Sequence, residues 1–358
     1  MQAHLPVVLG WRTASERSLR WSAADRVIHW CSFSVEILSA PGKELDLFQR
    51  VKRCTSEKCS NVTGMIEFAG VTRSANVEHA IQRGFGKMGV ADTFAFVVAD
   101  FSRVVAELTG DTAYQATKLD GSAAAARTVL HKGQPVVVFS ELAVSTGAKA
   151  LERVAAHEAG HVHLHRRGEA STDEMAGGPN QILRGLADIG IEEWRCERAA
   201  HMKGYKPAGA LSSTLSHVSY RIVQAWTEPL DILERTRRTV NLMQSLVVAF
   251  AYHAGSRRTF PGSDVERLYR DESWLDLMQL WERLAPADEI QGALTLATER
   301  ASAETLTVRA LRALGFEFRD PQDEQGFGFF RVIDGDELTH RMEVGFAWLE
   351  ENEPESLR

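Results

Sequence analysis

The sequence predicts an α+β fold, in which a mixed α/β region over residues 1–132 precedes a mainly helical region over residues 208–358. Two observations lead to this prediction. Short β-branched or alternating apolar runs, typical of strands, occur before residue 140, whereas longer segments with helix-spaced apolar residues dominate after it. The chain of 358 residues is also long enough for about two domains of ~150 residues each.

Three segments in the first part of the chain carry strand signals. Residues 31–38, CSFSVEIL, alternate between apolar and polar side chains. Residues 93–108 begin with an apolar run and continue with helical spacing. Residues 135–139, PVVVF, form a β-branched run that predicts a strand. The first third of the chain is therefore mixed in secondary structure.

A helical pattern runs from about residue 148 to residue 164. Ser145 or Thr146 is expected to cap its start, because both side chains can accept a hydrogen bond from the first turn. Two arginines followed by Gly168 mark its end, where cations suit the carbonyl terminus and glycine leaves the helical conformation. Residues 169–180 have the composition of a loop, and a second helix is predicted from about residue 188 to residue 203.

The region after residue 208 carries further helix signals and ends in a strand signal. Helical spacing occurs over residues 211–226 and 230–253 and in two or three parts of residues 263–314. Between residues 315 and 344 the aromatic segments FEF and FGFFRVI flank the polar stretch DPQDEQG. This pattern predicts a terminal β-hairpin.

Charge and composition disfavour several classes of protein. The formal net charge is −7, so nucleic acid is not an expected partner. Four cysteines are too few for a disulfide scaffold, and no apolar stretch reaches the ~20 residues that a membrane-spanning helix needs. With no secretion signal in the sequence, we expect a cytoplasmic protein without a membrane partner. Nothing in the sequence sets the oligomeric state.

One segment has the pattern of a metal-dependent hydrolase: His157-Glu158-Ala159-Gly160-His161, or H-E-x-x-H, inside the first predicted helix. Residues four apart share one face of a helix, so both imidazoles can bind one Zn²⁺ ion. Zinc lowers the pKa of water that it binds toward ~7. Glu158 can then accept a proton from this water and later donate it to a leaving amine, as a general base and acid.

The second predicted helix offers three glutamates for the third zinc ligand. Glu193 and Glu197 lie four residues apart on one face. We therefore expect Glu193 to bind the metal and Glu197 to orient a ligand histidine. Glu192 is the alternative ligand, because an error of one residue in the helix register rotates the face by about 100°.

A hydrolytic site also needs a side chain that stabilises negative charge on the reacting carbonyl oxygen. Tyr205 and His201 are the leading candidates, because they lie closely after the metal-binding part of the second helix. Sequence spacing does not choose among the other candidates, which are His217, Tyr220 and His253.

The segment RVAAHEAGHVHLH, residues 153–165, resembles the active-site helix of the ImmA/IrrE-type metallopeptidases, whose pattern is H-E-x-G-H-x-x-x-H. The matching residues are His157, Glu158, Gly160, His161 and His165. Residues 193–200, EWRCERAA, are similar to the family's E-x-x-A-N-x-F-A segment, whose first glutamate is the third zinc ligand. Here cysteine, glutamate and alanine replace the alanine, asparagine and phenylalanine of that pattern. The resemblance covers residues 133–207, about a fifth of the chain.

This resemblance implies a zincin-like metallopeptidase core over residues 133–207, with residues 135–139 as the edge strand along which an extended peptide substrate lies. It also implies an endopeptidase that cleaves a protein, such as a regulator or repressor in a bacterial stress or defence circuit. Two alternatives remain. One is a non-catalytic protein that uses the zincin fold for regulation or binding, and the other is a zinc hydrolase of a small amide.

Overall fold

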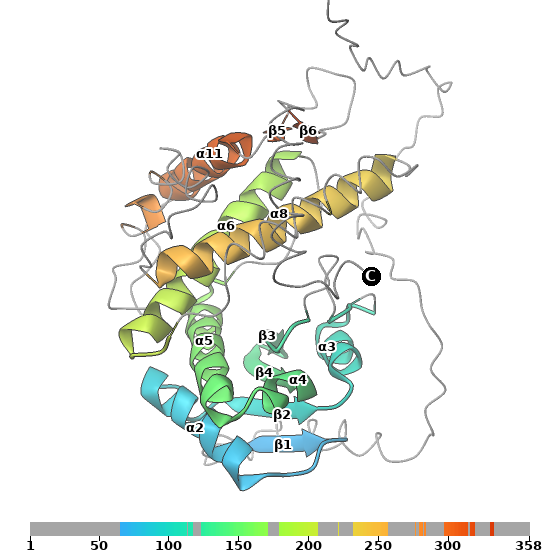
Figure 1. Ribbon diagram of the computed structural model, residues 1–358, viewed down its shortest axis with the longest axis vertical. Coiled ribbons are helices and arrows are strands. Elements are labelled where there is room, and N and C mark those ends of the chain that lie inside the picture. Colours follow the sequence, from blue (N-terminus) through green and yellow to red (C-terminus); the bar gives the residue numbers. More distant parts are fainter. Residues whose placement is uncertain are drawn as a thin grey trace, which may run out of the picture.

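The computed structural model describes residues 65–112, 114–116, 123–170, 179–206, 221, 232–256, 276, 279–281, 283, 297–313, 316–318 and 330–332. Within these residues the fold is α+β, with a four-stranded sheet and more helix than strand, as the sequence predicts (Figure 1). The strand predicted over residues 31–38 lies outside the described residues, as does nearly all of the helix predicted over residues 211–226.

The sheet has the strand order β1-β2-β4-β3. Its strands are β1 (Ile66–Ala69), β2 (Phe94–Val98), β3 (Ala126–His131) and β4 (Gln134–Ser140). The strands β1, β2 and β4 are parallel, whereas β3 runs antiparallel to β4. The strand signals at residues 93–108 and 135–139 correspond to β2 and β4.

The expectation that residues 135–139 form an edge strand is wrong. These residues belong to β4, which lies between β2 and β3, and β3 stands at the edge of the described sheet. The reason is the tight turn after β3, where Lys132 and Gly133 both have positive φ, 49° and 78°. A turn of this kind matches the twist of paired strands, so residues 126–131 fold back on β4 as a hairpin. Their mixed polar and apolar side chains gave no clear strand signal.

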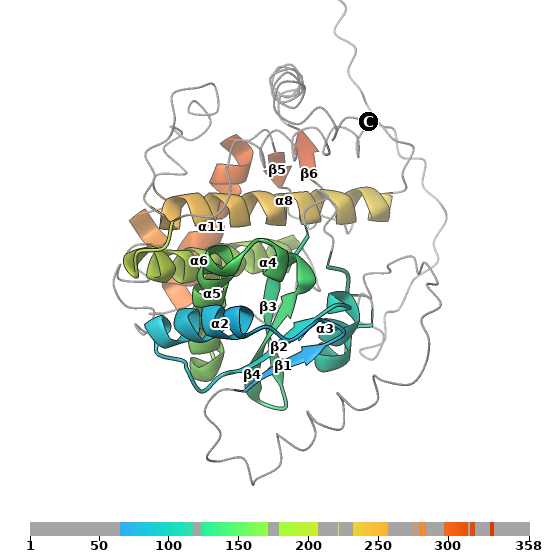
Figure 2. The same ribbon diagram turned by 60° about the horizontal axis from the view of Figure 1, so that its bottom comes forward.

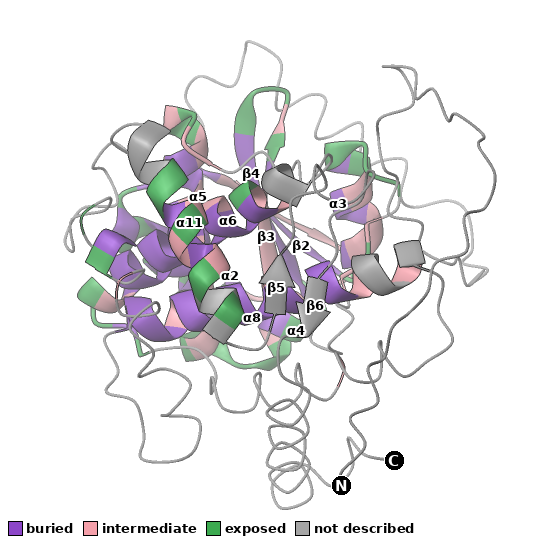
Figure 3. Cartoon of the chain, turned by 90° about the horizontal axis from the view of Figure 1, so that it is seen from above, coloured by how far each residue is buried: buried purple, intermediate pink, exposed green. Residues whose placement is uncertain are grey.

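Helices cover both faces of the sheet (Figure 2). They are α2 (Ala75–Met88), α3 (Phe101–Thr109), α4 (Glu141–Ser145) and α5 (Ala148–Arg167). Successive strand residues point to opposite faces, so Val97 and Val137 pack with α2 and α5, whereas Phe96 and Val138 pack with α3. Within the sheet, burial is greatest in the two central strands, β2 and β4 (Figure 3).

The helix α5 starts and ends where the sequence predicts, but the residue that caps its start differs. Gly168, with φ of 67°, caps its C-terminus, after basic residues in the last turn. The predicted N-terminal caps are wrong, because Gly147 precedes the helix and supplies no side-chain hydrogen bond. Ser145 and Thr146 instead donate to carbonyl groups of the short helix α4, at Leu142 and Ala143.

The second predicted helix is α6 (Pro179–Met202), which begins earlier than expected. Two further helices, α8 (Ile232–Gly255) and α11 (Ala297–Ala313), pack against α6. Figure 1 shows that α8 crosses α6, and Figure 2 shows α8 above α6. The strands β5 (Phe316–Phe318) and β6 (Phe330–Val332) pair antiparallel within the two aromatic segments near the C-terminus. Among the described residues, no helix has the length and apolar character to cross a membrane.

Glycines allow α5, α6 and α8 to approach one another closely. A Cβ atom added to Gly160 of α5 would lie 2.8 Å from Sγ of Cys196 on α6. A Cβ atom added to Gly255 of α8 would lie 3.0 Å from the carbonyl oxygen of Trp194, also on α6. Both distances are shorter than an ordinary carbon contact. The two crossings therefore bring the H-E-x-x-H segment, the glutamates of α6 and the end of α8 together.

Candidate metal centre

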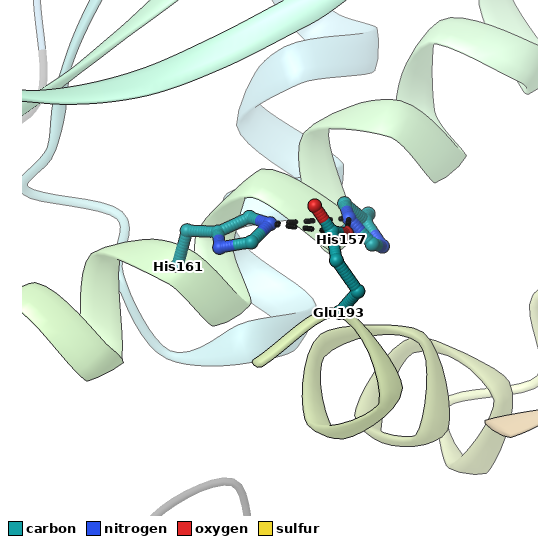
Figure 4. Close-up of side chains that lie close together, drawn as sticks. All are labelled: His157, His161 and Glu193. Atoms are coloured by element: carbon teal, nitrogen blue, oxygen red, sulfur yellow. Dashed lines mark hydrogen bonds and ion pairs between the residues drawn. The ribbon is translucent and has the colours of Figure 1, made fainter. Parts of the chain in front are cut away.

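The histidines of the H-E-x-x-H segment and one glutamate of α6 converge on one point. His157, His161 and Glu193 each offer one donor atom, and these atoms lie within 4.8 Å of one another (Figure 4). Nε2 of His157 lies 3.0 Å from Oε2 of Glu193 and 3.2 Å from Nε2 of His161. The third separation, from Nε2 of His161 to Oε2 of Glu193, is 3.6 Å.

These separations fit a tetrahedral metal ion. Zinc binds histidine nitrogen and carboxylate oxygen at about 2.0–2.2 Å, which corresponds to ~3.3 Å between neighbouring ligand atoms of a tetrahedron. The three measured separations, 3.0, 3.2 and 3.6 Å, lie around that value. The group can therefore hold a metal ion, and its nitrogen and oxygen donors suit zinc.

Two adjacent glutamates of α6 take different positions around His161. The carboxylate of Glu193 faces the Nε2 atoms of both histidines. The carboxylate of Glu192 instead contacts the other ring nitrogen, with Oε1 2.7 Å from Nδ1 of His161. The group that could hold a metal ion thus contains Glu193, the ligand preferred from the sequence, whereas the alternative, Glu192, contacts the outer nitrogen of His161.

A glutamate also contacts the outer nitrogen of His157. Oε2 of Glu197, a residue expected to orient a histidine, lies 3.3 Å from Nδ1 of His157. The same oxygen accepts a hydrogen bond from the guanidinium group of Arg153. This contact is an ion-pair distance without hydrogen-bond geometry, since Nδ1 of His157 has no hydrogen-bond partner among the described residues. The nearby negative charge favours a proton on Nδ1, which leaves the Nε2 lone pair for a metal. In each histidine, therefore, Nδ1 lies beside a carboxylate of α6 and Nε2 belongs to the group of three donor atoms.

The electrostatics of the group favour a cation. Burial alone would raise the pKa of Glu193, but the two imidazoles beside it hold that pKa well below its usual value of 4.5. Burial alone would lower the pKa of His161, but interactions with Cys196, Glu193 and Glu192 raise it well above 6.5. The buried carboxylates thus attract positive charge, which a divalent cation would supply as well as protons do.

Glu158 is anchored by the edge strand of the sheet. Its Oε2 accepts a hydrogen bond of 2.7 Å from the hydroxyl group of Thr128, in β3. The same hydroxyl lies 3.2 Å from the backbone carbonyl of Glu158. The Glu158 residue is 7% exposed. Thr128 was not singled out from the sequence, because 30 residues separate it from Glu158 and no spacing rule connects a strand with a helix.

The two leading candidates for charge stabilisation do not contact the metal-binding group. The hydroxyl group of Tyr205 donates to Oε1 of Glu152 at 2.9 Å, and Nζ of Lys87 lies 4.6 Å from its ring centre. His201 lies in the last turn of α6, and its buried Nδ1 atom has no hydrogen-bond partner among the described residues. His217 and Tyr220 lie outside those residues, and His253 is buried in α8.

The tyrosine that does contact the group is Tyr252 of α8, which the sequence did not reveal. Its hydroxyl oxygen lies 3.4 Å from Nε2 of His157, and the two rings meet edge to face with centres 5.1 Å apart. Burial raises the pKa of Tyr252 well above 10, so its hydroxyl group is protonated at neutral pH. The one available signal was its position three residues before Gly255, on the face of α8 that contacts α6.

Comparisons of the chain with protein-family models, curated proteins and solved structures find no match.

Proposed function

We propose that this chain is a zinc-dependent peptidase, in which His157, His161 and Glu193 hold the metal and Glu158 is the general base. The observation that carries the proposal is the triangle of donor atoms, with sides of 3.0, 3.2 and 3.6 Å, on the helix that also carries Glu158. The resemblance of residues 153–165 to the ImmA/IrrE-type metallopeptidases supports a zincin-like core and a protein substrate.

The residues around the metal-binding group divide the chemistry between them. A zinc ion held by His157, His161 and Glu193 would supply a Lewis acid and would lower the pKa of water toward ~7. Glu158 accepts the proton of the attacking water and delivers it to the leaving amine. Thr128 fixes one oxygen of that carboxylate at 2.7 Å. Glu192 and Glu197 hold the imidazole rings in the orientation that ligation requires.

The edge strand β3 supports a peptide as the substrate. Its outer backbone groups can pair with an extended chain, which gains main-chain hydrogen bonds by adding to the sheet. Such a chain would pass near Glu158, because Thr128 of the same strand contacts that carboxylate. In this proposal β3 takes the role that the sequence assigned to residues 135–139. The substrate would be a protein such as a regulator or repressor in a bacterial stress or defence circuit.

The test compares the wild-type chain with Glu158→Gln. Both proteins should contain about one zinc ion per chain by elemental analysis, because Glu158 is not in the ligand group. A peptide library made from a digested bacterial proteome is then incubated with each protein, and new termini are identified by mass spectrometry. We expect cleavage by the wild type and none by Glu158→Gln.

Glu107→Gln is the matched control. Glu107 is exposed on α3, on the face of the sheet opposite α5. The Glu107→Gln variant should therefore cleave the same peptides as the wild type. Equal cleavage by wild type and Glu158→Gln would refute the role of the general base, as would full activity of metal-free protein. Bound zinc without cleavage by any of the three proteins would favour the non-catalytic alternative.

A further inference from the structure

We propose that Tyr252 is a further catalytic residue, whose hydroxyl group donates a hydrogen bond to the substrate oxygen that becomes negatively charged during hydrolysis. This inference rests on the proposed function and adds to it the group that stabilises the transition state. It replaces Tyr205 and His201 in that role, since the hydroxyl group of Tyr205 is bound to Glu152 and His201 lies at the end of α6.

Packing fixes the position of Tyr252. Its ring meets the ring of His157 edge to face, with an interplanar angle of 72° and centres 5.1 Å apart. One turn further along α8, a Cβ atom on Gly255 would lie 3.0 Å from the carbonyl oxygen of Trp194 and 3.1 Å from the Cβ atom of Glu197. The backbone of α8 is therefore pressed against α6, the helix that carries Glu193. A tyrosine held by two packed helices is more precisely placed than one on a loop.

The hydroxyl group lies next to the atoms that would bind the metal. It is 3.4 Å from Nε2 of His157, and the three donor atoms are 3.0 to 3.6 Å from one another. The hydroxyl oxygen is therefore about as far from Nε2 of His157 as the three donor atoms are from one another. An oxygen atom of a substrate that approaches the centre beside His157 would come within its reach.

The chemistry of His157 frees this hydroxyl group for a substrate. Nε2 of a neutral imidazole has one lone pair, which can accept the proton of Tyr252 or bind a metal, and cannot do both. When His157 acts as a ligand, the hydroxyl group of the partly buried Tyr252 is available to donate to another acceptor. A carbonyl oxygen of the substrate provides one, and the bond strengthens as negative charge develops on that oxygen. Tyr252 keeps its proton throughout, while Glu158 transfers the proton of the water.

The first test measures steady-state kinetics of the zinc-loaded full chain with Tyr252→Phe, on a peptide that the wild type cleaves. Phenylalanine retains the ring that packs on His157 and removes only the hydroxyl group. We expect kcat to fall about 100-fold, as when one oxyanion donor is removed, while KM and the zinc dissociation constant change less than about threefold. The control is Tyr114→Phe, on the side of the sheet that faces α3, where Tyr114 contacts Phe101. An unchanged kcat in Tyr252→Phe would overturn the proposal.

The second test uses binding and does not depend on turnover. Acetohydroxamate binds metal ions through oxygen and can accept a hydrogen bond there, whereas 2-mercaptoethanol binds through sulfur, a weak acceptor. We expect Tyr252→Phe to weaken acetohydroxamate binding about tenfold and 2-mercaptoethanol binding less than twofold, as measured by calorimetry. Equal weakening of both ligands, or a tenfold loss of zinc affinity, would show a structural or ligand role and overturn the proposal.

The two tests separate this inference from the proposed function. If the wild type cleaves peptides and Tyr252→Phe cleaves them equally well, the role of Tyr252 fails and the peptidase stands. If the wild type cleaves no peptide but loses acetohydroxamate affinity selectively on Tyr252→Phe, the peptidase fails. In that second case Tyr252 is still a donor to an oxygen ligand at the metal-binding group.

Discussion

Gly160 sets how closely α5 and α6 approach, so Gly160→Ala should damage both stability and metal binding. The new Cβ atom would lie 2.8 Å from Sγ, 2.9 Å from Cβ and 3.0 Å from Cα of Cys196. An ordinary contact begins at about 3.4 Å, so the helices must separate by about 0.6 Å at this point. Metal ligands tolerate errors of only about 0.2 Å, and Glu193, on α6, moves away from the histidines of α5.

The expected loss of stability combines two opposed effects. Overpacking of a buried site costs typically 1–3 kcal/mol, whereas replacing a helical glycine by alanine gains up to about 1 kcal/mol. We therefore expect Gly160→Ala to lower the free energy of unfolding by about 1–2 kcal/mol in urea titrations of the metal-free protein. Zinc affinity, measured by competition with a chromophoric chelator, should fall about tenfold or more, because the ligands on α5 and α6 are pulled apart.

Gly86→Ala is the matched control, because Gly86 is also helical and a Cβ atom there would meet nothing within 4 Å. This control should be as stable as the wild type or more stable by about 0.5–1 kcal/mol, with unchanged zinc affinity. The double variant Gly160→Ala/Cys196→Ala should recover part of the stability, since it removes the nearest atom, Sγ. If Gly160→Ala matches Gly86→Ala in both measurements, the close helix crossing does not control the site.

Three further predictions concern other contacts of the chain. Thr128→Val removes the hydrogen bond of 2.7 Å to Glu158 and should lower kcat about tenfold with zinc content unchanged, whereas Thr128→Ser should retain most activity; equal kcat for the two variants would contradict this. Burial would raise the pKa of Glu152, but hydrogen bonds from Lys87 and Arg83 lower it to about 2. The ionised Glu152 therefore stabilises the folded chain fully above pH ~4.5, and this contribution is lost as pH falls toward 2. After a discount for the half-exposed cations, Glu152→Gln should cost about 1–2 kcal/mol at pH 7 and little near pH 2, as urea titrations at both pH values can check. Chelation of the metal should lower the melting temperature in calorimetry, and zinc at a hundred times its dissociation constant should restore about 2.7 kcal/mol; a melting temperature unaffected by either would contradict the metal site.

The parts of the site that could be predicted from the sequence follow from local spacing. His157 and His161 share a face of α5 because they lie four residues apart, and the same rule relates Glu193 to Glu197 on α6. Spacing within one helix does not say how two helices are rotated toward each other. The choice between Glu192 and Glu193 therefore needed the structure, in which each faces a different nitrogen of His161.

The contacts that the sequence did not reveal join elements far apart in the chain. Thr128 reaches Glu158 across 30 residues, and Tyr252 reaches His157 across 95 residues. Their positions depend on the strand order of the sheet and on the crossing of α8 over α6. Neither arrangement leaves a periodic pattern at these residues. The wrong prediction that residues 135–139 form the edge strand has the same cause. Their hydrophobicity predicts a strand but does not show which strands pair with it.

The close packing of α5 against α6 buries several carboxylates, and a bound cation would balance their negative charge. Gly160 lets α6 approach α5 closely enough for Glu192, Glu193 and Glu197 to reach the two histidines. This approach also concentrates negative charge in a region shielded from water, where an uncompensated carboxylate is costly. Arg153 neutralises part of the charge at Glu197, and the carboxylate of Glu193 faces the Nε2 atoms of the two histidines. A divalent cation held by His157, His161 and Glu193 would bind both helices and balance the charge of the buried carboxylates, so metal binding and packing at this crossing should be coupled.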